Sequence, residues 1–271
     1  MIATHLPWAS DSSRSLAFLC AVLCCMRAGN QGNLFKLLLL KAVSCYTAIM
    51  HTILCYGDSN TFGTNPGGGR WGIDQRWTGL LGSMLGGSYR IIEEGLGGRT
   101  TVFDDPLEPK KNGLEYLPVS LQSHRPLDLV ILSLVTNDCK SLNGANERII
   151  AKGLEKLAIM VKTHAYGPGY PIPQVLVISP IHIGDDIESS VFASFDRGSA
   201  ALSKRLANPI RNMAEQQHIL FFDAATVATS SPIDQLHMDQ EGHASLAKAL
   251  YSLILPVFGD TEKPQIPAEY A

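Results

Sequence analysis

Short apolar runs alternate with longer amphipathic stretches over most of this chain. The apolar runs predict buried strands at residues 52–57, 89–93, 127–134, 174–179 and 219–222. Helical spacing fills the intervals at 75–86, 113–124, 146–164, 192–217 and 239–254, and Pro209 is expected to kink or split the fourth of these helices. Strands that are apolar on both faces need a layer of helices on each side. The pattern therefore predicts a doubly wound, flavodoxin-like α/β sandwich with a five-stranded parallel sheet.

The chain has 271 residues, of which 45% are hydrophobic and 17% charged, as suits a globular domain with a substantial core. We expect that domain to span residues 50–256, followed by an extended or frayed tail over residues 257–271 that starts beside Pro256. The apolar runs at residues 15–26 and 34–43 are shorter than the roughly 18 to 20 residues that span a bilayer. Residues 1–49 are interpreted as a dispensable extension or an upstream mis-start, so that a chain beginning at Met50 would suffice for activity. The alternatives for this segment are a signal peptide or membrane anchor, and a structural element of the fold.

Charge and cysteine content exclude several classes of protein. The net charge is −3, which gives no electrostatic footprint for nucleic acid. The six cysteines show no metal-binding spacing and no disulfide framework, which favours a reducing compartment and a cytoplasmic location. Secretion is the alternative if the first apolar run is a signal peptide. Cys55 is expected in a buried strand, and Cys139 is expected to be partly accessible.

Three separated blocks carry residues suited to nucleophilic catalysis. Ser59 follows the first predicted strand, and Asp234 lies three positions before His237. A histidine held by a carboxylate can take the proton of a serine hydroxyl, so these three residues predict a serine hydrolase. Asn137 closes the third strand, where its amide could stabilise an oxyanion. In a parallel sheet, all of these positions follow strand ends and can meet at one edge. Taken alone, Ser59 would more often be a helix cap, and the other blocks make the nucleophile the favoured interpretation.

The blocks resemble those of the SGNH, or GDSL-type, hydrolases, closest to the arylesterase/acyltransferase branch. The matching segments are 57–63, 76–79 with 93–101, 126–138 and 234–237, within a resemblance that covers residues 51 to 256. The resemblance implies an ester hydrolase that needs no cofactor or metal. It implies an oxyanion hole made by the Ser59 N–H, the Gly98 N–H and the Asn137 amide, with Gly97 one position away as the alternative to Gly98.

Other residues near these blocks are expected to support the site or to lie outside its chemistry. Asp58 and Asp138 are expected to order their loops through hydrogen bonds rather than to join in the chemistry. Val135 stands where the family usually has glycine, which predicts added bulk beside the site. His243 is expected in an exposed first helical turn. Two possible ligand sets, His237 with Asp239 and His243, and Asp104 with Asp105, lack a recognised metal-ligand spacing.

The sequence therefore predicts a serine carboxylic ester hydrolase acting on small or short-acyl esters through an acyl-enzyme, with acyl transfer to alcohols as an extension. A carbohydrate or small-molecule O-deacetylase, and a catalytically weak ligand-binding module, are the alternatives. The expected partner is a small-molecule ester, without nucleic acid and without a membrane span, and a homo-oligomer stays open.

Overall fold

The protein is described here by a computed structural model that places residues 50–259, a compact unit that begins at Met50. The expectations for residues 1–49, and for the tail from residue 260, lie outside the described residues. In the part of the chain that the structure describes, no helix is long and apolar enough to cross a bilayer.

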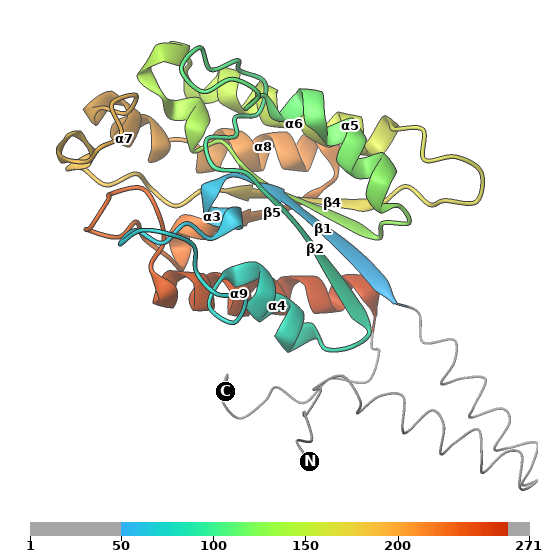
Figure 1. Ribbon diagram of the computed structural model, residues 1–271. Helices are drawn as coiled ribbons and strands as arrows, with labels where there is room; N and C mark the ends of the chain where they lie inside the picture. The colour runs from blue at the N-terminus through green and yellow to red at the C-terminus, as the bar shows by residue number, and fades with distance from the viewer. Residues whose placement is uncertain (1–49, 260–271) are drawn as a thin grey trace, which may run out of the picture. The chain divides into compact units, whose positions relative to one another are not determined.

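Five parallel strands form one sheet in the order β2-β1-β3-β4-β5 (Figure 1). The strands are β1 (His51–Gly57), β2 (Tyr89–Gly95), β3 (Leu129–Ser133), β4 (Gln174–Ser179) and β5 (Leu220–Asp223). This order is that of the flavodoxin-like fold, so the predicted fold class is confirmed. The predicted strands differ from the observed ones only at their ends.

Alternate residues of the sheet pack into two separate cores. In β1, Ile53 and Cys55 face one core, while Leu54 and Tyr56 face the other. Two helices, α4 (Trp77–Leu85) and α9 (Gln240–Ile254), cover the first face (Figure 1). The second face is covered by α5 (Gly113–His124), α6 (Glu147–Thr163) and α8 (Ala207–Gln217). A strand buried on both sides explains why the sequence shows continuous apolar runs.

The predicted helix over residues 192–217 is wrong in its first part and divided in its second. Residues 192–196 are not helical, and the remainder forms α7 (Arg197–Ser203) and α8. Asp196 starts α7 by accepting the Ser199 N–H at 2.8 Å, as an N-cap does. Pro209 lies in the first turn of α8, where its missing N–H leaves no intrahelical hydrogen bond unmade.

The remaining elements are short. They are α3 (Ser59–Phe62) and the 3₁₀ helices η1 (Asn137–Cys139), η2 (Ser141–Asn143), η3 (Ile187–Ser189), η4 (Ala224–Thr226) and η5 (Leu255–Phe258). The expectation of an extended tail from Pro256 is wrong for its first residues, because η5 continues the packed domain. The Phe258 ring lies 4.3 Å from that of His51 and 5.5 Å from that of Tyr89, between ring centroids.

The segment 76–79 links the start of α4 to β2. Arg76 donates to both carboxylate oxygens of Glu93, at 2.7 and 2.6 Å, in the fork geometry that suits an arginine–carboxylate pair. Trp77 is fully buried between α4 and α9.

Val135 combines a strained backbone with a fully buried side chain. Its φ is 78°, in the left-handed region that β-branched residues rarely adopt, and its side chain is buried in the core under α6. The left-handed backbone costs about 1–3 kcal/mol, and burial of a valine returns about 1.5–3 kcal/mol. The two effects are of similar size, which explains how valine persists where glycine fits the backbone better.

We therefore expect Val135→Gly to be close to the wild type in stability and Val135→Ala to be less stable than Val135→Gly by about 1 kcal/mol. Alanine loses most of the burial but keeps the strain, whereas glycine also relieves the strain. Urea unfolding of the three proteins measures this order. Val130 in β3 is the matched control, because glycine in an ordinary strand should be worse than alanine. The same order at both positions would contradict the strain argument.

Candidate active site

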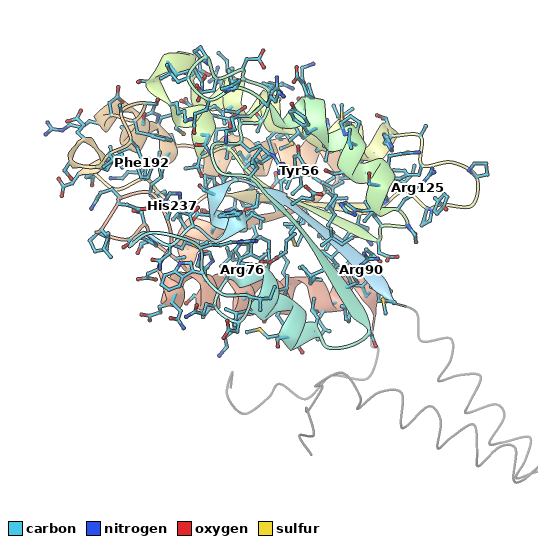
Figure 2. The ribbon with its side chains drawn as sticks, viewed as in Figure 1. Tyr56, Arg76, Arg90, Arg125, Phe192 and His237 are labelled. Atoms are coloured by element: carbon cyan, nitrogen blue, oxygen red, sulfur yellow. The ribbon has the colours of Figure 1, made fainter. Side chains whose placement is uncertain are left out.

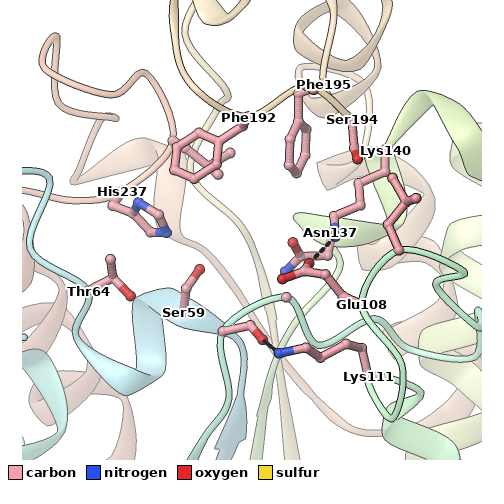
Figure 3. A pocket seen from close by; sticks show the side chains of 15 residues that line it. Ser59, Thr64, Glu108, Lys111, Asn137, Lys140, Phe192, Ser194, Phe195 and His237 are labelled. Atoms are coloured by element: carbon pink, nitrogen blue, oxygen red, sulfur yellow. Dashed lines mark hydrogen bonds and ion pairs between the residues drawn. The ribbon is translucent and has the colours of Figure 1, made fainter. Parts of the chain in front are cut away.

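Ser59 is the first residue of α3, directly beyond the end of β1. The N-cap of this helix is Asp58, whose Oδ1 accepts the Asn60 N–H at 3.0 Å. The interpretation of Ser59 as the helix cap is therefore wrong, because Asp58 is the N-cap residue. The Ser59 hydroxyl is left to face a cleft, where Figure 3 shows it opposite the ring of His237.

The structure brings Asp234 and His237 into direct contact. Asp234 Oδ2 lies 2.6 Å from His237 Nδ1, and Asp234 Oδ1 accepts the N–H groups of Leu236 and His237 at 3.0 Å each. Burial alone would raise the pKa of Asp234, but these hydrogen bonds outweigh it and hold that pKa below its usual value. The carboxylate stays ionised and occupies Nδ1, which leaves Nε2 as the nitrogen that can exchange a proton in the cleft.

Asn60 fixes the distance between these two parts of the site, a role that the sequence analysis missed. Its Oδ1 accepts the Met238 N–H at 2.9 Å, and its Nδ2 lies 3.5 Å from the Leu236 carbonyl. One buried amide thus holds the backbone of the residues before and after His237 against α3, the helix that bears Ser59. The signal was present in the sequence as a polar residue directly after the serine, at a position where an apolar residue would suffice for packing.

Three candidate oxyanion donors lie around the same cleft. As the first residue of α3, Ser59 has an N–H with no partner inside the helix. Gly98 has a φ of 79° in the turn closed by the Arg99 N–H on the Leu96 carbonyl at 3.1 Å, a position that favours glycine. The Asn137 side-chain nitrogen donates to the Arg99 carbonyl at 3.1 Å. That bond uses one amide hydrogen and fixes the orientation of the other.

Two buried aspartates support these loops. Asp138 accepts the Thr101 N–H at 3.1 Å and also accepts the Thr101 hydroxyl, which ties the η1 segment to the loop after β2. Burial raises the pKa of Asp138 to about 7 despite those hydrogen bonds, and burial likewise raises the pKa of Asp58. Neither carboxylate is among the residues that line the cleft.

Arg99 is a second residue whose role the sequence analysis missed. Its guanidinium donates to the Gly57 carbonyl at 3.0 Å and to the Glu94 carbonyl, and it lies 4.1 Å from the centroid of the Tyr56 ring. It therefore links the carboxyl ends of β1 and β2, while its own carbonyl holds Asn137. The arginine directly after two glycines was the available signal.

The cleft has a volume of about 480 Å³ and lies beyond the carboxyl ends of the strands, where ligands of such sheets bind. Figure 2 shows Phe192 and His237 together at that end of the sheet. The cleft is lined by Ser59, Thr64, Gly97, Gly98, Leu107, Glu108, Lys111, Asn137, Lys140, Phe192, Ala193, Ser194, Phe195, Leu236 and His237. Among the described residues Ser59 Oγ makes no hydrogen bond to His237, and catalytic bonds of this kind commonly form only with substrate in place.

Several expectations about neighbouring residues are corrected. His243 is fully buried rather than exposed, and its Nδ1 accepts the Trp77 backbone N–H at 3.3 Å. Cys139 is buried rather than partly accessible, whereas Cys55 is buried as expected. Val135 packs in the core and adds no bulk to the cleft lining.

The two sets considered as metal ligands are engaged elsewhere. Asp239 caps α9 by accepting the Gly242 N–H at 2.8 Å, and Asp105 pairs with Lys140 at 2.6 Å. Over residues 50–259, no group of three or more histidine, cysteine, aspartate or glutamate side chains is placed to hold a metal ion.

A parallel sandwich with this cleft at its carboxyl edge defines the class of protein, a hydrolase of the SGNH type. A model of the GDSL-like lipase/acylhydrolase family matches residues 55–245, and the chain belongs to that family. The resemblance seen in the sequence blocks is therefore confirmed. No curated protein sequence matches the chain.

Solved structures of esterases are similar over about three quarters of the chain. The aryl esterase of M. smegmatis shares 38% identity at a TM-score of 0.71, over 75% of this chain and 98% of its own. Est24, a carbohydrate acetylesterase from Sinorhizobium meliloti, shares 38% identity at a TM-score of 0.71, over 77% of this chain and 100% of its own. A carbohydrate acetylesterase family member from the same organism shares 34% identity at a TM-score of 0.73, over 78% of this chain and 100% of its own.

His243 gives the fold a pH dependence of known sign. Burial lowers its pKa from 6.5 to about 4; Asp239 opposes this shift, and His237 and Arg76 add to it. The folded state therefore holds a neutral imidazole between those two pH values, while the unfolded state binds a proton. The stability that depends on neutral His243 is complete above pH 6.5 and is lost as the pH falls from 6.5 to 4.

We expect the free energy of unfolding of the wild type to fall by about 3 kcal/mol more than that of His243→Gln over this pH range. Glutamine can still accept the Trp77 N–H but does not titrate. Urea unfolding at several pH values measures the difference, and His182→Gln on the surface is the control that should follow the wild type. Parallel pH curves for the wild type and His243→Gln would contradict the assignment.

Proposed function

We propose that the protein is a serine carboxylic ester hydrolase that acts on small or short-acyl esters through a covalent acyl-enzyme. The observation that supports this most is the meeting of Ser59, the Asp234–His237 pair and the candidate oxyanion donors at one cleft (Figure 3). These groups lie in segments that follow four different strands, β1, β2, β3 and β5, and their proposed roles are complementary.

The proposed reaction begins with attack of Ser59 Oγ on the acyl carbonyl carbon. His237 Nε2 takes the hydroxyl proton, and Asp234 stabilises the resulting imidazolium through the 2.6 Å contact at Nδ1. The carbonyl oxygen becomes an oxyanion, and collapse of the tetrahedral intermediate expels the alcohol, which takes the proton from His237. Water then attacks the same carbon with His237 as the base, and the acid is released.

The oxyanion is stabilised by the Ser59 N–H, the Gly98 N–H and the second hydrogen of the Asn137 amide. These donors are held before substrate arrives, Asn137 by the Arg99 carbonyl and Gly98 by its turn. Donors fixed in advance favour the transition state over the ground state, because they need no reorganisation when charge develops.

Acyl transfer to an alcohol is the proposed extension. Phe192, Phe195 and Leu236 give one side of the cleft an apolar surface, and the Phe192 ring lies edge-on to His237 at 5.6 Å between centroids. An apolar wall beside the general base favours an organic alcohol over water at the acyl-enzyme stage.

Carbohydrate O-deacetylation is the second candidate function. It is supported by the similarity to Est24 and by the charged residues Glu108, Lys111 and Lys140 on the other side of the cleft. Comparison of phenyl acetate with an acetylated sugar as substrates separates the two functions.

We expect Ser59→Ala and His237→Ala each to lower kcat by four or more orders of magnitude (~10⁴-fold), and the double variant to lose little more, because the residues act as a unit. A fluorophosphonate label should attach to Ser59 and not to Ser194, which also lines the cleft. Activity on p-nitrophenyl acetate and mass mapping of the labelled peptide measure both. Full activity in folded Ser59→Ala would overturn the proposal, and a wild type that neither turns over nor labels would indicate a binding module.

We expect Asn137→Ala to lower kcat by about a hundred- to a thousandfold with little change in KM, because its amide acts mainly in the transition state. Asn143→Ala is a matched control: its side chain contacts the Asn137 carbonyl at 3.1 Å from outside the cleft lining. Steady-state kinetics on p-nitrophenyl acetate separates the two constants. An increase in KM alone would make Asn137 a substrate-positioning residue.

A further inference from the structure

A cluster of charged side chains forms the cleft wall on the far side of Asn137 from His237 (Figure 3). Lys140 Nζ pairs with Glu108 Oε2 at 2.8 Å and with Asp105 Oδ2 at 2.6 Å. Lys111 Nζ donates to the Gly97 carbonyl at 2.6 Å. The sequence analysis gave none of these side chains a function.

The wall is fixed in place by Asp105. This carboxylate is 1% exposed, and its Oδ1 accepts the N–H groups of Leu107 and Glu108 at 2.9 and 3.1 Å. The Lys140 side chain is 5% exposed, so both groups of the inner ion pair are shielded from water. The loop that carries Glu108 is therefore anchored to the residue three positions after Asn137.

Glu108 is the member of the wall that meets the cleft. Its side chain is 49% exposed, and a Cβ placed on Gly98 would come within 2.8 Å of Glu108 Oε2. The carboxylate therefore lies against the turn that carries the proposed oxyanion donor. It is close enough to limit what occupies the space beside that turn.

The direction of the acyl group follows from the proposed chemistry. The leaving oxygen takes its proton from His237 and so lies on the His237 side of the reacting carbon. The carbonyl oxygen points to Ser59, Gly98 and Asn137. The acyl group is then directed away from His237, into the part of the cleft whose lining includes Glu108 and Lys140.

We propose that the Glu108–Lys140 ion pair closes the acyl end of the cleft and restricts the substrate to acetyl- and propionyl-sized acyl groups. A longer apolar chain would displace water from the half-exposed Glu108 carboxylate without offering it a hydrogen bond. Desolvation of an ionised group outweighs the burial of a few methylene groups. This inference rests on the proposed function and adds to it the acyl length and the residue that sets it.

The test measures kcat/KM for p-nitrophenyl acetate, butyrate and hexanoate with the wild type and three variants. Glu108→Ala removes both bulk and charge, and Lys140 keeps its partner Asp105, so the fold should survive. We expect this variant to raise the hexanoate-to-acetate ratio at least tenfold. Glu108→Gln keeps the bulk without the charge and should raise the ratio less. Glu147→Ala breaks an ion pair with Arg205 at 3.5 Å outside this cleft and should leave the ratio unchanged.

The outcomes separate this inference from the proposed function. An unchanged ratio in both Glu108 variants, with acetate still hydrolysed, would overturn the inference alone, as would a wild type that prefers hexanoate. A folded wild type that hydrolyses none of the three esters would overturn both. Glu108→Gln decides the matter if the alanine variant does not fold, because a neutral glutamine preserves the shape of the wall.

Discussion

The site depends on the position of β1 between β2 and β3 in the sheet. Gly57, its last residue, is paired in register with Gly95 of β2 on one side and with Ser133 of β3 on the other. A Cβ on Gly57 would lie 2.0 Å from Thr61 Oγ1, so no side chain fits between the sheet edge and α3. Because three strand ends meet here, the loops that follow them bring the candidate nucleophile and the candidate oxyanion donors Gly98 and Asn137 to one place. Arg99 strengthens this junction by donating to the Gly57 carbonyl.

The loop that carries His237, the candidate general base, reaches the same place from the β5 edge of the sheet. It follows β5, which is separated from β1 by β3 and β4. Strand pairing therefore cannot position His237, and side-chain hydrogen bonds do so instead. Asn60 holds the backbone on both sides of the imidazole, and Asp234 holds its ring. The residue after the nucleophile is thus as important for alignment as the acidic partner of the histidine.

Backbone strain is stored next to the candidate catalytic groups. Val135, with a φ of 78°, lies two residues before Asn137, and Gln235, with a φ of 63°, lies between Asp234 and His237. Non-glycine residues in this conformation persist only where the surrounding structure holds them. Val135 is held by the burial of its side chain. Gln235 is held by a hydrogen bond from the Gly184 N–H to its carbonyl, at 2.8 Å. Each turn lies shortly before cleft-lining residues: Asn137 follows Val135 by two positions, and Leu236 and His237 follow Gln235.

The sequence by itself determined the sheet, its strand positions, the family and the residues expected to meet at one edge, because apolar periodicity and strand-end placement are local signals. It did not determine which loop contacts which. The break before α7, the burial of His243 and the tether by Asn60 each depend on partners more than thirty residues away or on a competing local cap. The Glu108–Lys140 wall joins segments that carry no shared motif. Such contacts are set by the packing of loops on the finished sheet, so only the tertiary structure decided them.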